Sequence, residues 1–470
     1  MEKWKAGEEK MKKYLKFNCL ETIFKSIYIV HLLLAFNALV NRTVLTTITS
    51  AIVLVLGCLV MIGKIFTVPG YLKRKNVIVL NLFLVSYLIS TFVNMEFGAV
   101  ASLKGFIWLV LQIWILYLIS EETDVKKEFW IIGNIYVMVT SIQNLIGFLM
   151  FLGGYAYRNV SPEGEIHMLG FMWNRLWGVY DDPNHGAIIT AAAILITLGL
   201  YRCAKKKYIK ILYRISLFVQ FSYIILSDSR TGVICFAVGV ALLYLIRYLY
   251  TRKQINVKTI VKAAIVSFLG IFLFLGLVTP IQRGYAFVGK YTAGLVKNVE
   301  KQPGKDDDDL EVGREEMSSD PSNRRFDIWR SGVEIFSSSP VVGTGWSNLN
   351  PYAHKYLPDT YIVDNDYKEF VSLHNIFFDV LAGQGLIGIS IFVILILNSV
   401  VFTIKWFKKL KKEEYDFMAV MFSILVIMLF ASLLISFVFY VNSPESFVFW
   451  FIFGYFMFTL QKAKTRTNLN

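Results

Sequence analysis

Long apolar runs are the feature of this sequence that most restricts its fold. A helix that crosses a bilayer needs about 20 mostly apolar residues, because no water is available there to bond unpaired backbone groups. Twelve runs of this kind can be drawn along the 470 residues. They lie near 22–40, 45–63, 77–94, 98–120, 129–152, 184–201, 209–226, 230–248, 259–279, 375–402, 416–438 and 442–460. The sequence therefore predicts an all-α integral membrane protein with about 12 transmembrane helices.

The distribution of basic residues predicts how the chain crosses the membrane. With the N-terminus inside, the seven inner segments hold 30 Lys and Arg, whereas the five short outer loops hold four. Those four are Arg42, Arg158, Arg175 and Arg230. Basic residues accumulate in cytoplasmic segments, so we expect both termini in the cytoplasm. The formal net charge of +14 is then explained by topology and by contacts with anionic membrane lipids, and no nucleic-acid partner is predicted.

The cysteines give no sign of a metal or disulfide framework. All four lie at the inner face or within predicted spans: Cys19, Cys58, Cys203 and Cys235. Disulfide frameworks are built in oxidising compartments, and no cysteine falls in an outer loop. We expect neither a metal site nor a cofactor.

Two outer segments are long, 153–184 and 280–374. Within the second, the stretch Gln302–Asp320 is strongly charged and has no aromatic residue, which predicts a disordered spacer. Its four aspartates at 306–309 lack the spacing and the glycine of an EF-hand calcium loop.

A helix is predicted just after this spacer. Asp320-Pro321 supplies a capping residue followed by a proline at the first helical position, and Pro340 ends the segment. One apolar stripe at helical spacing is formed by Phe326, Trp329, Val333 and Phe336. Such a helix lies on the membrane or caps the outer ends of the spans. Arg325 borders the stripe and is expected to face a buried site, whereas Arg324 points away from it.

Four polar residues at the predicted outer boundary are candidates for chemistry: Arg175, Arg230, Arg325 and His374. Guanidinium groups bind phosphate oxygens bidentately, and a histidine can accept a proton from a hydroxyl near neutral pH. An isolated arginine at a helix end is more often an interfacial anchor, and an isolated histidine there is more often structural. The combination and order of the four carry more weight than any one of them.

An acidic pair offers an alternative. Asp181-Asp182 at the same boundary suggests a metal-dependent glycosyltransferase, in which carboxylates hold a divalent cation against a diphosphate. Capping of the helix that begins at Pro183 explains the pair equally well. We interpret His185, His167 and His31 as structural.

Several sequence elements resemble the O-antigen ligase and O-antigen polymerase family of bacterial envelope polysaccharide enzymes. The matching elements are RLWGVYDDPN at 175–184, SRTG at 229–232, RFDIW at 325–329, SSPVVGTGWSNL at 338–349 and HNIFFDVLAGQGLIG at 374–388. The resemblance divides the chain into 1–174 with the first five spans, a ligase-like region at 175–402 with the outer loop 280–374, and 403–470 with the last two spans. The first five spans match the family only in hydropathy.

This resemblance implies a function and roles for the four residues. Such enzymes move a glycan from undecaprenyl diphosphate onto a hydroxyl of a sugar or lipid-linked glycan acceptor, at the outer face of the bacterial cytoplasmic membrane. By resemblance, Arg230 and Arg325 bind the diphosphate, Arg175 takes the arginine place of the earlier element, and His374 is the catalytic base. The implied reaction is one inverting displacement that needs no metal. A regulator of chain length is a further candidate partner.

Three alternatives stay open. A polysaccharide polymerase is favoured over a ligase, because no feature of the sequence selects a lipid A core. From another class, a lipid-linked oligosaccharide flippase or other transporter should carry charges along a path through the membrane, whereas the polar residues here gather on one side. The third alternative, a catalytically inactive scaffold, conflicts with the presence of the family's motif residues.

Overall fold

The structure is a computed structural model that describes residues 2–41, 43–67, 70–160, 166–252, 256–293, 312, 324–365 and 369–469. The helices in these residues are α1 (Glu2–Ala35), α2 (Val44–Thr67), α3 (Val77–Val93), α4 (Ala99–Leu111), α5 (Val125–Leu152), α6 (Pro183–Cys203), α7 (Lys207–Leu226), α8 (Arg230–Tyr250), α9 (Val257–Ala293), α10 (Arg325–Ser338), α11 (Leu349–Tyr356), α12 (Ile376–Phe407), α13 (Lys412–Ser432) and α14 (Pro444–Leu469). A π-helical turn, η3 (Gln112–Tyr117), continues α4, and three short 3-10 turns are η1 (Tyr71–Lys73), η2 (Met95–Phe97) and η4 (Trp346–Asn348). The strands are β1 (Ala156–Val160), β2 (Ile166–Met172) and β3 (Arg175–Gly178).

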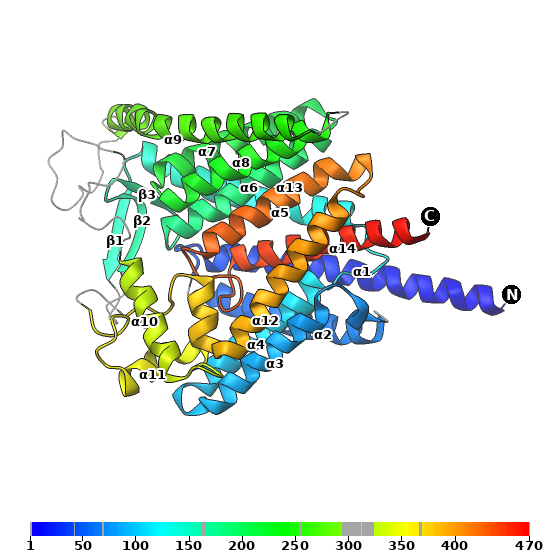
Figure 1. Ribbon diagram of the computed structural model, residues 1–470. Coiled ribbons are helices and arrows are strands. Elements are labelled where there is room, and N and C mark those ends of the chain that lie inside the picture. Colours follow the sequence, from blue (N-terminus) through cyan, green and yellow to red (C-terminus); the bar gives the residue numbers. More distant parts are fainter. Residues whose placement is uncertain are drawn as a thin grey trace.

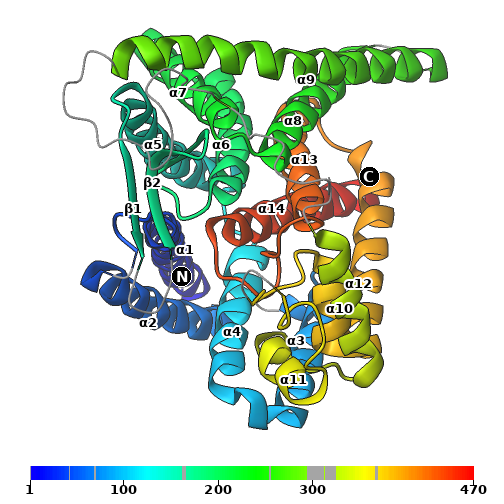
Figure 2. The same ribbon diagram turned by 90° about the vertical axis from the view of Figure 1, so that its left-hand side faces the viewer.

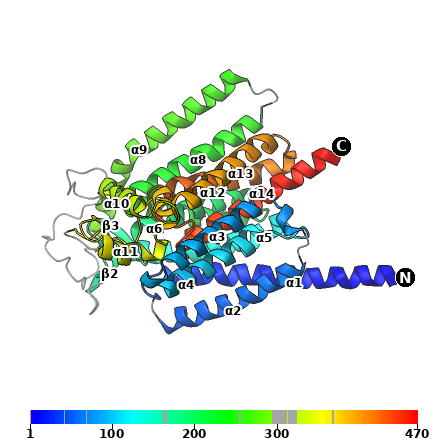
Figure 3. The same ribbon diagram turned by 60° about the horizontal axis from the view of Figure 1, so that its bottom comes forward.

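The helices form one bundle with two different ends. Both termini lie at one end, and the three strands with α10 and α11 lie at the other, which we call the strand end (Figures 1 and 3). Helix α6 runs through the middle of the bundle and is the most enclosed candidate span. Its small residues Ala191, Ala192 and Ala193 are fully buried, which allows neighbouring helices to approach closely. Helix α9 lies at the edge in all three views (Figures 1, 2 and 3).

Ten helical segments in the described residues are long and apolar enough to cross a membrane. They correspond to ten of the twelve predicted spans, and the chain is a multi-pass membrane protein. The third predicted span falls on α3, which has 17 residues, and the twelfth falls on α14, which is outside the ten. Helix α9 continues through Pro280 to Ala293, so the first part of the predicted outer segment 280–374 is helical. Proline is tolerated within membrane helices when neighbouring groups satisfy the freed carbonyl.

The segment 153–184, predicted to lie outside, contains a small antiparallel sheet, which the all-α prediction did not include. Its strand order is β1-β2-β3, and Met172 pairs with Arg175 across a two-residue turn. The turn residues Trp173 and Asn174 both have positive φ, 52° and 59°, as a tight hairpin turn requires. Neither is glycine, so the usual sequence signal for such a turn was absent.

Helix α12, which covers the span predicted at 375–402, is bent sharply. Gly385 has φ 61° and ψ −158°, so the first part of the helix, 376–384, takes a different direction from 386–407. The bend brings Phe377 against Phe392, with ring centroids 5.3 Å apart. A Cβ at Gly385 would lie 2.5 Å from the carbonyl carbon of Val341, so the backbone approach requires glycine.

A buried group of charges lies among α1, α2 and α5, where the sequence analysis expected few. The Lys25 ammonium lies 2.7 Å from a Glu21 carboxylate oxygen and 3.2 Å from a Glu128 oxygen. Lys64 lies 3.0 Å from Glu21 and donates to the carbonyl of Ile115 in the π-helical turn. Two acids and two bases thus compensate one another inside the protein.

Some expectations fall on residues that the structure does not describe. The predicted spacer Gln302–Asp320, apart from Val312, and the cap Asp320-Pro321 lie outside the described residues, as does Arg42. Helix α10 itself begins at Arg325 and ends at Ser338, within the predicted limits.

Candidate functional site

The four predicted site residues come from four separate elements. Arg175 begins β3, Arg230 begins α8, Arg325 begins α10, and His374 lies just before α12. Strand β3 and α10 lie at the strand end, and the view onto that end shows α10 and α11 beside α12 and across from the strands (Figure 2).

Arg175 is mostly buried and joins three elements. Its Nε donates a hydrogen bond to the carbonyl of Ser227 at 2.8 Å, and its Nη2 donates to Asn184 Oδ1 at 3.1 Å. Ser227 caps α7 and Asn184 lies in the first turn of α6, so the guanidinium holds β3 against both helices. This explains the RLWGVYDDPN element as a structural unit that places Arg175 beside the α7–α8 turn.

The SRTG element forms the first turn of α8. Ser229 is the N-cap, and its hydroxyl accepts a hydrogen bond from Gly232 N at 3.2 Å. Thr231 is buried, whereas Arg230 is exposed. Arg230 therefore combines an accessible guanidinium with the N-terminus of a helix, where backbone N–H groups also favour anions.

The buried face of α10 differs from the predicted one. Ile328, Gly332 and Ile335 are buried, while Phe326 and Val333 of the predicted stripe are 67% and 46% exposed. Two residues of the predicted stripe are thus exposed, and the helix packs through its small residues at 331 and 332, which allow a closer approach than the aromatic positions do. The helix does cap the bundle, as one of the two predicted placements stated.

Close packing of α10 places it against the loop that carries His374. A Cβ added to Gly332 would lie 2.9 Å from Leu373 Cδ1, and the Trp329 ring stacks on Phe378 with centroids 5.5 Å apart. Arg325 lies seven residues before Gly332, which places it on the same face of the helix. Arg324 lies seven residues before the buried Ser331 in the same way, so the packing of α10 does not select Arg325 over Arg324.

Two of the motif elements bind each other through their backbones. Thr344 N donates to the carbonyl of Ala382 at 3.0 Å, and Gly345 N donates to that of Gly383 at 2.9 Å. A third hydrogen bond between the same two segments runs from Leu386 N to the Pro340 carbonyl at 2.8 Å. The VVGTG and LAGQGL elements are thus two sides of one backbone contact, which fixes the segment after α10 to the bend of α12.

His374 lies between two anchored neighbours and has an unusual backbone conformation. Its φ is 52°, in the left-handed region that non-glycine residues seldom adopt. On one side Leu373 N donates to Asp379 Oδ1 at 3.0 Å. On the other, Asn375 caps α12 by accepting from Phe377 N at 2.9 Å, and its side chain donates to the Leu433 carbonyl at 3.0 Å. The helix cap is therefore Asn375, which leaves the imidazole of His374 outside that role.

A buried segment without helical structure connects these elements. Residues 433–443, between α13 and α14, were predicted to belong largely to the eleventh span, but α13 ends at Ser432. Tyr440 in this segment stacks on Trp346 with ring centroids 5.3 Å apart, and it accepts a hydrogen bond from Gln384 Nε2 at 2.8 Å. Burial, with a smaller contribution from the nearby Asp379 carboxylate, raises the pKa of Tyr440 well above its usual value, so its hydroxyl stays protonated.

Contacts connect the elements that carry three of the four predicted residues. Arg175 bonds to Ser227, two residues before the cap of α8. Helix α8 packs closely against α13, with Cys235 Sγ 3.6 Å from the Ile427 carbonyl. The residue after α13 is Leu433, whose carbonyl accepts from Asn375 beside His374. These contacts connect β3, α8, α13 and the residues that precede α12, and α10 packs on α12.

The acidic pair and His185 line a small cavity. Asp182 caps α6 by accepting from Asn184 N at 2.5 Å, as the capping interpretation predicted, and Asp181 accepts from Asn41 Nδ2 at 2.6 Å. His185 Nδ1 lies 2.6 Å from the buried carboxylate of Glu445, a partner that the sequence analysis did not name. The cavity has a volume of about 170 Å³. Among the described residues, no group of three or more His, Cys, Asp or Glu side chains is placed to hold a metal ion.

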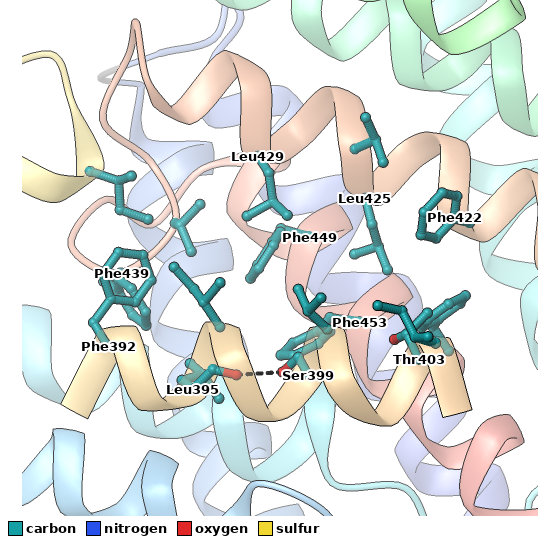
Figure 4. Close-up of a pocket in the computed structure, with 17 residues that line it drawn as sticks. Phe392, Leu395, Ser399, Thr403, Phe422, Leu425, Leu429, Phe439, Phe449 and Phe453 are labelled. Carbon is teal, nitrogen blue, oxygen red and sulfur yellow. Dashed lines mark hydrogen bonds between the residues drawn. The ribbon is translucent and has the colours of Figure 1, made fainter. Parts of the chain in front are cut away.

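An apolar cavity of about 240 Å³ lies between α12, α13 and α14 (Figure 4). At the end nearest the candidate site it is lined by Ile376, two residues after His374, and by Phe439 of the 433–443 segment. Its other lining residues continue along α12 as far as Ile404. The polar side chains that line it are Ser399 and Thr403, and the Ser399 hydroxyl donates to the Leu395 carbonyl at 2.7 Å. The cavity therefore suits a hydrocarbon chain.

A comparison with known protein families shows that several of these elements lie in one domain. Residues 215–393 match the O-antigen ligase family. The chain carries an O-antigen ligase domain. No curated protein matches the chain.

The O-antigen ligase domain contains three of the four predicted residues, Arg230, Arg325 and His374. It also contains Asp379 and both sides of the backbone contact at Gly385. Arg175 lies 40 residues before the domain, so its assignment depends on the sequence resemblance and on its bond to Ser227. The family confirms the predicted resemblance and the coarse class, a membrane protein of the type that transfers lipid-linked glycans.

Proposed function

We propose that this protein transfers a glycan from undecaprenyl diphosphate to a sugar hydroxyl at the outer face of a bacterial cytoplasmic membrane. The single observation that carries the proposal is the O-antigen ligase domain, because its residues 215–393 include the exposed arginine at the head of α8 and the anchored His374. The strand end then faces outward and both termini lie in the cytoplasm, in agreement with the 30-to-4 contrast in basic residues.

The mechanism follows from the residues at the strand end. Arg230, Arg325 and Arg175 bind the diphosphate and offset its charge as it leaves. The acceptor oxygen attacks the anomeric carbon of the donor sugar while the bond from that carbon to the phosphate oxygen breaks. His374 takes the proton of the acceptor hydroxyl. The attack and departure occur on opposite faces of the sugar, so the anomeric configuration inverts, and no metal is needed.

The apolar cavity along α12 supports a lipid-linked donor. A diphosphate held near His374 would place its hydrocarbon chain beside Ile376, at one end of the cavity. From Phe392 to Ile404 the cavity follows about 18 Å of helix, at 1.5 Å per residue. This is longer than half of the roughly 30 Å hydrocarbon core. The path is long enough to hold part of a polyisoprenoid chain.

A transporter remains the alternative class, and the buried charges bear on it. Among the described residues, Glu21, Lys25, Lys64 and Glu128 form a cluster of charges buried between helices, but they are 5% exposed or less and pair with one another. Charges that line a path should contact water. Their packing therefore favours the transferase.

Purified protein provides the test of function. Cells that lack this gene should accumulate its lipid-linked glycan, which can be extracted and used as donor. Wild-type protein in lipid nanodiscs should release undecaprenyl diphosphate and form longer glycans, and it should do so in excess EDTA. Movement of intact donor across a sealed vesicle without bond cleavage would favour the flippase, and loss of activity in EDTA would transfer the diphosphate site to Asp181 and Asp182.

The product distinguishes a polymerase from a ligase. We favour a polymerase that builds an O-antigen, capsule or exopolysaccharide, in which the acceptor is another lipid-linked repeat unit. With the extracted donor as the only glycan, a polymerase makes a ladder of lengths. A ligase leaves the donor unchanged until a lipid A core acceptor is added.

A further inference from the structure

Asp379 is a buried carboxylate that the proposed mechanism does not use. It lies in the first turn of α12 and is 1% exposed. Its Oδ1 accepts hydrogen bonds from Leu373 N at 3.0 Å and from the indole Nε1 of Trp346 at 3.2 Å. Its Oδ2 accepts from the hydroxyl of Ser436. Three donors from three segments thus converge on one carboxylate.

Each donor lies in a segment that forms the candidate site. Leu373 precedes His374, Trp346 follows the VVGTG contact, and Ser436 belongs to the 433–443 segment. A carboxylate can accept from all three because both of its oxygens are acceptors. An asparagine has one acceptor oxygen and an amide that only donates, so it would leave the Ser436 hydroxyl or the two Oδ1 donors without their partner.

The bond to Leu373 restricts the backbone at His374 directly. A left-handed conformation at a non-glycine residue costs of order 1–3 kcal/mol and persists only where the surroundings hold it. Here the residue before His374 is held by Asp379, and the residue after it is held through the Leu433 carbonyl. Both anchors depend on residues 433–443, since Ser436 fixes the carboxylate that fixes Leu373.

We propose that Asp379 is a positioning residue, which holds His374 at the place from which it takes the proton of the acceptor hydroxyl. The inference rests on the proposed function of His374. Asp379 touches neither donor nor acceptor, because its carboxylate is enclosed by its three donors, and it acts through the backbone of Leu373. It therefore affects the transfer step and leaves binding of the diphosphate to the arginines unchanged.

A double-mutant cycle tests this role. The variants are Asp379→Asn, His374→Gln and the two combined, assayed with the lipid-linked donor extracted from cells lacking the gene. Binding is measured separately with undecaprenyl diphosphate alone, and stability by thermal unfolding in detergent. Gln384→Met is the matched control, because Gln384 is equally buried in the same part of α12 and bonds to the same segment through Tyr440.

Loss of a general base costs about 10²–10⁴-fold in rate. We expect Asp379→Asn to lower kcat at least tenfold with unchanged binding of undecaprenyl diphosphate. The double variant should be no slower than His374→Gln alone, because a positioning residue has nothing left to position. Gln384→Met should keep kcat within about threefold of wild type, the spread of context-dependent effects at a site outside the mechanism.

The outcomes separate this inference from the proposed function. If the loss of kcat in the double variant equals the product of the two single losses, the positioning role is overturned while His374 stays the base. The same conclusion follows if Asp379→Asn keeps the kcat of wild type. Full activity of His374→Gln would overturn both. If Asp379→Asn fails to fold, Ser436→Ala removes one donor only, and it should give a smaller loss of kcat that again disappears in the His374→Gln background.

Discussion

The guanidinium of Arg175 donates its Nε hydrogen to the backbone carbonyl of Ser227 across 2.8 Å. The bond ties the first residue of β3 to the turn that starts α8, three residues before Arg230. Two of the arginines proposed to bind the diphosphate therefore differ in burial and in structural role. Arg175 is part of the framework and mostly buried, whereas Arg230 is exposed and rests on that framework.

The first prediction separates the effects of these two arginines. Arg230→Ala and Arg175→Ala should both abolish polymer formation, and Lys should rescue either one poorly because it lacks the bidentate fork. Only Arg175→Ala should also lower the free energy of unfolding, by about 1–3 kcal/mol, since it leaves buried acceptors unpaired. Polymer gels and thermal unfolding are the two measurements. Equal thermal stability of both variants would contradict the framework role of Arg175.

The second prediction concerns α10. Arg325→Ala should reduce polymer formation, to a lesser degree than the loss of Arg230. Arg330 is the matched control, because it lies on the same helix, is 81% exposed and pairs only with Glu334 among the ion pairs described. Arg330→Ala should leave activity near that of wild type, as surface substitutions usually do. If the two variants were equally active, Arg325 would have no place in the site.

The third prediction concerns His374. His374→Ala and His374→Gln should bind undecaprenyl diphosphate normally and lose about 10²–10⁴-fold in transfer rate. His354→Gln is the control, because His354 is exposed on α11 and pairs with Glu369 at the surface. The structure makes the test sharper, since Asn375 rather than His374 caps α12. A His374→Gln enzyme that builds full-length polymer would leave the histidine without a catalytic role.

The fourth prediction concerns orientation. In a background without native cysteines, a membrane-impermeant thiol reagent should label cysteines placed at Ser318 and Ser347 from outside intact cells. A cysteine at Thr251, at the opposite end of α8 from Arg230, should react only after the membrane is opened. The reason is the excess of basic residues on the predicted inner side. Labelling at Thr251 in intact cells would reverse the orientation and remove the outward-facing site.

The fifth prediction concerns the apolar cavity. Val400 lines it, whereas its neighbour Val401 is 64% exposed on α12 and does not. Val400→Trp should fill part of the cavity and raise the KM for the lipid-linked donor about tenfold, equivalent to losing one buried side-chain contact. Val401→Trp should have no such effect. A donor on a short isoprenoid should be insensitive to either substitution, and equal sensitivity of both donors would exclude the cavity as the chain site.

Much of the fold was predictable because membrane spans depend on length and composition alone. The cap at Asp182 and the start of α8 at Arg230 were also predictable, since each follows from local chemistry. The hairpin at Trp173 carried no glycine to signal it. The bend at Gly385 follows from a backbone contact with residues more than 40 positions earlier, which no local pattern encodes.

The basic residues of the candidate site could be predicted from the sequence, but the contacts that hold them in place could not. Arginines and a histidine are visible against an apolar background, and the family resemblance ordered them. The 433–443 segment is as apolar as a span, so hydropathy assigned it to a helix. The bond of this segment to Asp379, like the pairing of His185 with Glu445, is set by packing between elements far apart in the chain.

The buried charges of the first five helices have a consequence for how the chain is made. Glu21 and Lys25 lie four residues apart on α1, so this helix enters the membrane with its own counterion. Lys64 arrives on α2 as one unmatched positive charge, and balance returns only when α5 brings Glu128. The charge balance among α1, α2 and α5 is therefore complete only after the first five helices have been made and packed together.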